Sequence, residues 1–157
     1  MPLPYYKQEQ DYTCGAATAR MIVNGLLNIN EPEDFYAALL KTNEQVGTQR
    51  QWFEALNNLP SIECKTGTHA TLQTLQQLID EHYSVALLYI LHTPDDDPVG
   101  HWAVLNTFNE NTITLKDPWM GDAHELPLPF FLENWYSDPA LCDGVKDPCP
   151  WVAIKKK

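Results

Sequence analysis

The chain has 157 residues, with 21 acidic and 10 basic side chains and a formal net charge of −11 at pH 7. Domains usually contain about 100–200 residues, so we expect one domain that spans residues 1–157 and buries a sizeable core. An acidic surface repels phosphate backbones, which argues against nucleic-acid binding, and no apolar run reaches the roughly 18 residues that a membrane helix needs.

Composition also bears on the compartment. The N-terminal residues MPLPYYKQEQ contain no apolar core of a secretory signal. Four cysteines are too few for a disulfide scaffold. We therefore expect a cytoplasmic protein by default, with export by a signal-independent route as the alternative.

The first half of the chain is predicted to be helical. Asp11 and Thr13 are suitable caps for a helix that begins near Cys14 and ends at Asn24-Gly25 or Asn28. Apolar residues at helical spacing predict three more helices. These run from Pro32 through Leu40, from Thr48 or Gln49 to the stop at Pro60, and from Thr71 to Ile79.

From Tyr83 the pattern changes to that of strands. Residues 84–91 (SVALLYIL) are apolar on both faces, which predicts a central strand. Residues 101–108 and 112–117 predict a hairpin joined through Asn109-Glu110-Asn111, and residues 151–156 predict a last strand. The class is therefore α+β, with the helices segregated from an antiparallel sheet.

Two segments are predicted to lack strands. The DDDP sequence at residues 95–98 is typical of a loop. Residues 117–150 are rich in proline, and we expect them to form loop with one short helix at about residues 130–136.

Three short motifs carry residues suited to nucleophilic catalysis. Cys14 lies at a predicted helix start, where unpaired N–H groups and partial positive charge favour a thiolate. His101 lies at the head of a predicted strand, and Asp117 lies at the end of the next strand. A thiol, an imidazole and a carboxylate are the nucleophile, base and orienting group of acyl transfer.

The predicted hairpin brings two of these residues together. A three-residue loop from Asn109 to Asn111 would place residue 103 opposite residue 117. Because side chains alternate along a strand, His101 and Asp117 would then be diagonal neighbours on one face, about 7 Å apart at the backbone. We expect that face to be the one turned toward the first helix.

A glutamine upstream of the cysteine completes the set. The side chain of Gln8 can donate one N–H to an oxyanion, and the backbone N–H of Cys14 can donate the other. Gln10 is the rival for this role, but it lies closer to Cys14 in the sequence.

In this order the motifs resemble those of papain-like cysteine peptidases of the bacteriocin-processing type, which remove double-glycine leader peptides. The resemblance covers Gln8 to about Gly121 and includes CGAA at 14–17, GHWAV at 100–104 and LKDP at 115–118. It departs at Thr13, where transporter-linked members often have aspartate.

The resemblance implies a papain-like fold with the nucleophile at the N-terminus of the central helix. It also implies roles: Cys14 as nucleophile, His101 as general base and acid, Asp117 as the orienting residue and Gln8 as the oxyanion residue. The substrate would be a peptide or protein. No cofactor or metal is needed, and a transporter partner is not implied by this chain, which resembles a stand-alone member.

Two other functions remain as alternatives. The same thiol chemistry could transfer the acyl group to an amine or thiol, as in transpeptidase-like or phytochelatin-synthase-like enzymes. A non-cleaving module that only binds peptides is the other alternative, although such modules usually lack the nucleophile or the histidine.

The remaining cysteines and histidines have simpler interpretations. Cys142 and Cys149 could form a disulfide or stay free, and their spacing with Cys64 and His69 is poor for a zinc site. We expect the other histidines, His69, His82, His92 and His124, on the surface. We expect a set of aromatic residues in helices of the core: Trp52, Phe53, Trp135 and Tyr136.

Overall fold

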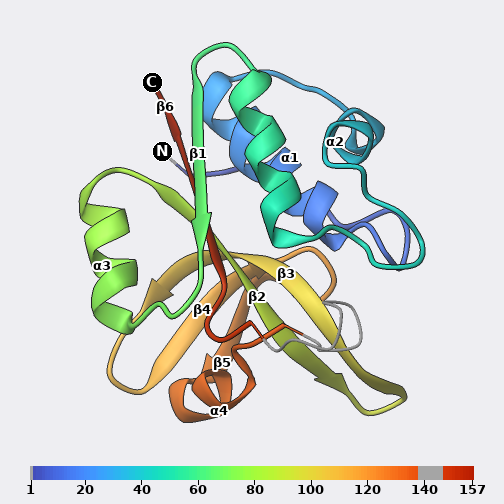
Figure 1. Cartoon of the computed structure of the whole chain (residues 1–157). Helices are drawn as coiled ribbons and strands as arrows, with labels where there is room; N and C mark the ends of the chain where they lie inside the picture. The colour runs from blue at the N-terminus through green and yellow to red at the C-terminus, as the bar shows by residue number, and fades with distance from the viewer. Residues whose placement is uncertain (1, 138–146) are drawn as a thin grey trace.

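A six-stranded antiparallel sheet forms the frame of the protein, with strand order β1-β6-β2-β3-β4-β5 (Figure 1). The computed structural model describes residues 2–137 and 147–157. The strands are β1 (Ile62–Gly67), β2 (Ser84–Thr93), β3 (Asp96–Phe108), β4 (Thr112–Asp117), β5 (Gly121–Pro127) and β6 (Trp151–Lys156).

Helices cover both faces of this sheet. They are α1 (Cys14–Leu27), α2 (Glu33–Leu39), the 3₁₀ helix η1 (Arg50–Asn58), α3 (Leu72–Asp80) and α4 (Leu128–Asn134). The first three supply the core of one face, and α3 and α4 supply the core of the other (Figure 1). Among the described residues, no helix combines the length and apolarity needed to cross a membrane.

Strand β3 shows how the two cores are divided. Trp102 and Val104 belong to the core under α1, whereas Ala103 and Leu105 belong to the core under α3 and α4. Successive side chains of a strand point to opposite faces, so each face receives every second residue. The prediction that residues 84–91 form a strand buried on both faces is confirmed, because β2 contributes to both cores.

The predicted helices exist, with differences at their ends. Thr71 caps α3 through a capping box with Thr74, and Asn28 ends α1 in the left-handed conformation, φ 53°. Thr13 occupies the N-cap position of α1, but its side chain does not cap, because its hydroxyl exchanges hydrogen bonds with the backbone of Gln10 instead. Pro32 is the N-cap of α2 rather than its first residue.

Three sequence predictions about strands were wrong. Strand β1 was not predicted. Strand β5 lies within residues 117–150, which were predicted to form loop with one helix at about 130–136. That helix, α4, begins earlier, at Leu128. Both strands lie at the sheet edges and carry many partly or fully exposed residues, so they lack an apolar pattern. The predicted loop at 95–98 is instead the tip of the β2–β3 hairpin, with Thr93 paired to Asp96.

The β3–β4 hairpin reaches the expected register by an unexpected route. Beside the turn Phe108 pairs with Ile113, whereas the predicted three-residue loop would pair it with Thr112, so the predicted register is wrong there. A register shift between Leu105 and Thr107 then brings Val104 opposite Lys116. A bulge adds one residue to one strand and so restores the parity that the prediction needed.

We predict that Gly15→Ala destabilises the fold by roughly 1–3 kcal/mol, the usual cost of forcing extra atoms into a filled site. A Cβ atom at Gly15 would lie 2.5 Å from Thr48 Oγ1 and 2.6 Å from Thr48 Cβ. Urea unfolding followed by circular dichroism measures the change. A midpoint equal to that of the wild type would show that the segment around Thr48 yields without cost.

Candidate active site

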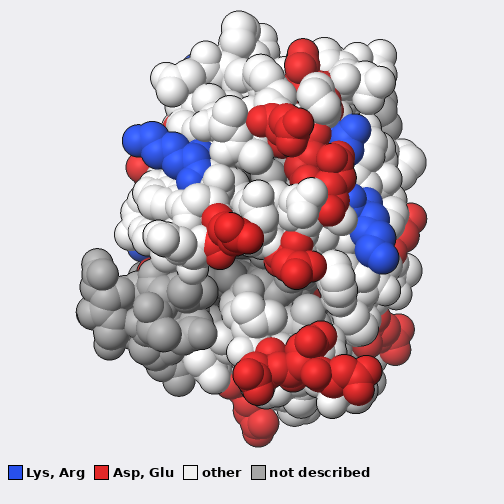
Figure 2. Space-filling model, turned by 90° about the vertical axis from the view of Figure 1, so that its right-hand side faces the viewer, with Lys and Arg blue, Asp and Glu red and all other residues white. Residues whose placement is uncertain are grey.

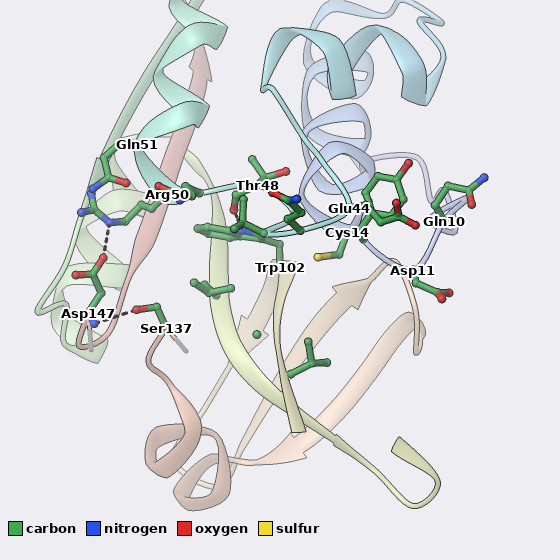
Figure 3. Close-up of a pocket in the computed structure, with 18 residues that line it drawn as sticks. Gln10, Asp11, Cys14, Glu44, Thr48, Arg50, Gln51, Trp102, Ser137 and Asp147 are labelled. Atoms are coloured by element: carbon green, nitrogen blue, oxygen red, sulfur yellow. Dashed lines mark hydrogen bonds and ion pairs between the residues drawn. The ribbon is translucent and has the colours of Figure 1, made fainter. Parts of the chain in front are cut away.

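Cys14 is the first residue of α1 and is 8% exposed. No side chain caps this helix start. Its unpaired N–H groups therefore leave partial positive charge around the thiol. Figure 3 shows Cys14 at the N-terminal end of α1, beside the cleft.

His101 and Asp117 lie in direct contact. The distance from His101 Nε2 to Asp117 Oδ1 is 2.6 Å, and the two residues are 4% and 0% exposed. Because Asp117 takes Nε2, Nδ1 of the ring is left for Cys14, with which the imidazole also interacts. The structure thus brings the predicted thiol, imidazole and carboxylate into one chain of contacts.

The shared face is not the one that was expected. By alternation His101 and Asp117 lie on the side of Ala103 and Leu115, which belongs to the core under α3 and α4. The expectation that both residues face the first helix was therefore wrong. Contact with Cys14 is made at the N-terminal end of α1 rather than along its body.

The carboxylate of Asp117 accepts three further hydrogen bonds. Tyr89 donates its hydroxyl to Oδ2 at 2.6 Å. The backbone N–H groups of Trp119 and Met120 donate to Oδ1 at 2.9 and 3.0 Å. Asp117 therefore both contacts His101 and closes the turn that follows β4.

Sequence reasoning missed Tyr89 as a member of this site. Tyr89 pairs directly with His101 in the β2–β3 register, and its ring meets the imidazole edge to face at a centroid distance of 5.8 Å. Burial raises the pKa of the Tyr89 hydroxyl, so it stays a hydrogen-bond donor at physiological pH. The only sequence signal was a tyrosine inside a strand that is apolar on both faces.

Electrostatics in this cluster favour the ionised forms of His101 and Asp117. Burial alone would lower the pKa of His101, but the hydrogen bond to Asp117 and the neighbouring Cys14 thiol outweigh it and raise that pKa. Burial likewise would raise the pKa of Asp117, but the contacts with His101 and Tyr89 lower it. These contacts favour an imidazolium at His101 beside the carboxylate of Asp117.

Gln8 lies close to this cluster but is already engaged. It is 6% exposed, and its Nε2 donates to the carbonyls of Gln10 at 2.8 Å and Asp11 at 3.2 Å. Its Oε1 is buried without a hydrogen-bond partner. Gln10 is exposed and contributes its backbone carbonyl to this arrangement.

Backbone contacts hold the segment that carries Gln8. The N–H of Gln8 donates to the carbonyl of Pro118 at 2.9 Å, and the hydroxyl of Tyr5 donates to the carbonyl of Asp117 at 2.7 Å. The buried carboxylate of Glu33 accepts the N–H of Glu9. The N-terminal segment is thus fixed to the turn after β4 and to α2.

Two cavities adjoin the cysteine–histidine pair. The larger, about 750 Å³, is lined by Cys14 and Trp102 and extends to Arg50 and Asp147 (Figure 3). The smaller, about 500 Å³, is lined by His101, Gln8 and Trp119. Together they form an extended site of a size suited to a peptide segment.

The other predicted residues lie away from this site. Among residues 2–137 and 147–157, no group of three or more His, Cys, Asp and Glu side chains is arranged to hold a metal ion. Cys142 lies outside the described residues, so its pairing with Cys149 stays a hypothesis. His69, His82 and His92 are exposed as expected, whereas His124 is half-buried.

The aromatic residues predicted in the core differ in burial. Phe53 and Trp135 are buried, whereas Trp52 and Tyr136 are half-buried. Trp135 and Tyr136 also lie just beyond α4, which ends at Asn134.

This fold is that of known cysteine peptidase domains. The peptidase domain of Streptococcus ComA, a bifunctional ABC transporter of a quorum sensing pathway, is 18% identical with a TM-score of 0.70, and 97% of each chain is covered. A double glycine motif protease from an AMS/PCAT transporter, solved with its leader peptide, is 15% identical with a TM-score of 0.66, covering 99% of this chain and 92% of that one.

A C39-like peptidase from Bacillus anthracis is also similar, with 13% identity, a TM-score of 0.67, and coverage of 99% of this chain and 95% of that one. No curated protein matches the sequence significantly. The model of the Peptidase_C39 like family matches residues 2–140. The chain therefore belongs to the Peptidase_C39 like family, as the sequence motifs indicated, and has its papain-like α+β fold.

We predict that brief treatment with iodoacetamide near pH 6 alkylates Cys14 before Cys64 and Cys149. Burial raises the pKa of the Cys64 thiol to about 12 and also raises that of Cys149, so both stay protonated. Cys14 has an imidazole beside it and a cleft in front of it. Intact-mass analysis and peptide mapping give the order, and earlier labelling of Cys64 or Cys149 would contradict it.

Proposed function

We propose that this chain is a cysteine peptidase that hydrolyses a peptide or amide bond through a thioester on Cys14. The observation that carries the proposal is the chain of contacts from the Cys14 thiol through His101 to the buried carboxylate of Asp117. A thiol at a helix start with a base that a third group orients is the arrangement of nucleophilic catalysis. Membership of a peptidase family supports the same conclusion.

The reaction follows from the positions of these groups. The Cys14 thiolate attacks the substrate carbonyl, and the His101 imidazolium gives its proton to the leaving nitrogen as the C–N bond breaks. His101 then takes a proton from water, whose oxygen attacks the thioester carbonyl and releases the acid and the thiolate. Asp117 and Tyr89 hold the imidazole in place throughout and transfer no proton.

The oxyanion would be stabilised by the N–H of Cys14 and by Gln8. Gln8 has a short hydrogen bond to Gln10 and a longer one to Asp11. Release of the longer bond frees one N–H of the amide for the oxyanion. The cost is low, because the 3.2 Å bond lies at the weak end of the usual range.

The decisive experiment is mass-spectrometric profiling of cleavage in a peptide library, with the Cys14→Ala protein as control. The proposal expects cleavage by the wild type alone and a transient mass increase equal to the acyl group on Cys14. Addition of a competing amine separates hydrolysis from acyl transfer through the product formed. A folded wild type that cleaves no peptide and forms no acyl adduct would refute it.

We predict that Gln8→Ala lowers turnover by about 100- to 1,000-fold, the usual cost of one oxyanion donor. The fold and the alkylation of Cys14 should stay largely intact, because the contact between Cys14 and His101 does not involve Gln8. The kinetic constants of both proteins on one cleaved peptide give the answer. Unchanged turnover in Gln8→Ala, with severe loss in Gln10→Ala, would transfer the role to Gln10.

We predict that Asp117→Ala is severe and Asp117→Asn intermediate, whereas Cys14→Ala and His101→Ala abolish turnover. The amide oxygen of Asn can still accept the His101 N–H, but the negative charge is lost. The contact with Asp117 raises the pKa of His101, so its removal lowers that pKa and deprotonates the imidazolium at lower pH. The alkaline limb of the pH–rate profile should therefore move to lower pH.

Profiles of the Asn variant and the wild type on the same peptide test this shift. An unmoved alkaline limb with full activity in both Asp117 variants would show that Asp117 serves only the turn after β4.

A further inference from the structure

The two cavities are divided between the reacting groups. Cys14 lines the larger cavity and His101 lines the smaller. His101 must reach the nitrogen that leaves, so the substrate residues after the scissile bond lie on the His101 side. The smaller cavity is therefore the leaving-group half of the site, an assignment that rests on the proposed function.

Acidic residues line this leaving-group cavity. Asp11 comes from the loop before α1, and Asp96 and Asp97 come from the tip of the β2–β3 hairpin. All three are exposed, and no Lys or Arg among the described residues lines the cavity. Figure 2 shows the side of the molecule toward which this hairpin projects, where acidic side chains predominate over Lys and Arg.

Two further features bear on a cationic, N–H-rich ligand. Trp119 is 41% exposed, and Lys7 Nζ lies 5.3 Å from its ring centroid, so a ligand cation at this ring would replace the exposed ammonium of Lys7. Gln8 also lines the cavity, and its buried Oε1 has no hydrogen-bond partner. An unpaired buried acceptor is costly, and an N–H donor from a ligand would remove that cost once the Gln8 side chain turns, because Oε1 has almost no accessible surface.

We propose that the leaving-group cavity selects substrates with a lysine or arginine within the first two residues after the scissile bond. The cationic side chain would lie between the carboxylates of Asp96 and Asp97 and the face of Trp119.

The first test compares a cleaved peptide that has arginine after the scissile bond with the same peptide carrying citrulline, which has the shape of arginine without the charge. We expect kcat/KM to be roughly three- to tenfold higher for arginine, as for a few solvent-exposed charge pairs. The ratio should fall toward one between about 0.05 and 0.5 M salt, because salt screens exposed carboxylates.

The variant Asp96→Asn/Asp97→Asn should weaken the preference for arginine while it keeps turnover of the citrulline peptide, with Asp11 as the carboxylate that remains. The matched control is Asp95→Asn/Asp34→Asn, which removes the same charge from exposed residues that do not line the cavity. The control should keep the preference. Equal turnover of the two peptides by the active wild type would overturn the proposal and leave the proposed function intact.

A binding measurement separates the two proposals. Argininamide is titrated into the nitrogen-15-labelled Cys14→Ala protein, with citrulline amide as the neutral probe, and the indole N–H signal of Trp119 is followed. We expect argininamide alone to shift this signal, and less so in the Asp96→Asn/Asp97→Asn background. A shift with argininamide but no turnover by the wild type would contradict the proposed function and leave the cavity's preference standing. Equal shifts with both probes would contradict the proposed preference of the cavity for a cation.

Discussion

The buried carboxylate of Asp117 is the constraint on which the site depends. A charge removed from water is tolerated only when its lone pairs are satisfied, and Asp117 has no exposed surface. Donors from β2, from β3 and from the turn after β4 converge on it. These bonds fix both the orientation of the His101 ring and the path of the turn. The carbonyls of Asp117 and Pro118 in turn accept hydrogen bonds from Tyr5 and Gln8, and so hold the N-terminal segment in place.

The position of Cys14 depends on a second constraint, the close approach of α1 to the rest of the cleft. Gly15 allows it, because Thr48 lies where a side chain would be. Trp102 fixes Thr48 in turn, since its indole N–H donates to the Thr48 carbonyl at 2.9 Å. Packing between α1 and β3 thus fixes the position of the Cys14 thiol, whereas hydrogen bonds fix the His101 imidazole. A change in either set of contacts would move the two groups apart.

Much of this arrangement could be predicted from local sequence patterns. The predictions that failed concerned elements and contacts that depend on residues distant in the sequence. The helix at Cys14 and the strands around His101 and Asp117 follow from periodicity and breakers. Strands β1 and β5 could not be predicted, because edge strands are specified by their single neighbour rather than by an apolar pattern. Tyr89 could not be assigned to the site either, since its partner Asp117 is remote in the sequence.

The acidic surface and the buried pair of His101 and Asp117 are separate electrostatic environments. The carboxylates of Asp96 and Asp97 are exposed, so water and ions screen them over a Debye length of about 8 Å at physiological ionic strength. The charge on His101 is instead buried and in contact with Cys14, where screening is weak. Local pairing therefore governs the charge of His101, and under our proposal the surface carboxylates act on the substrate.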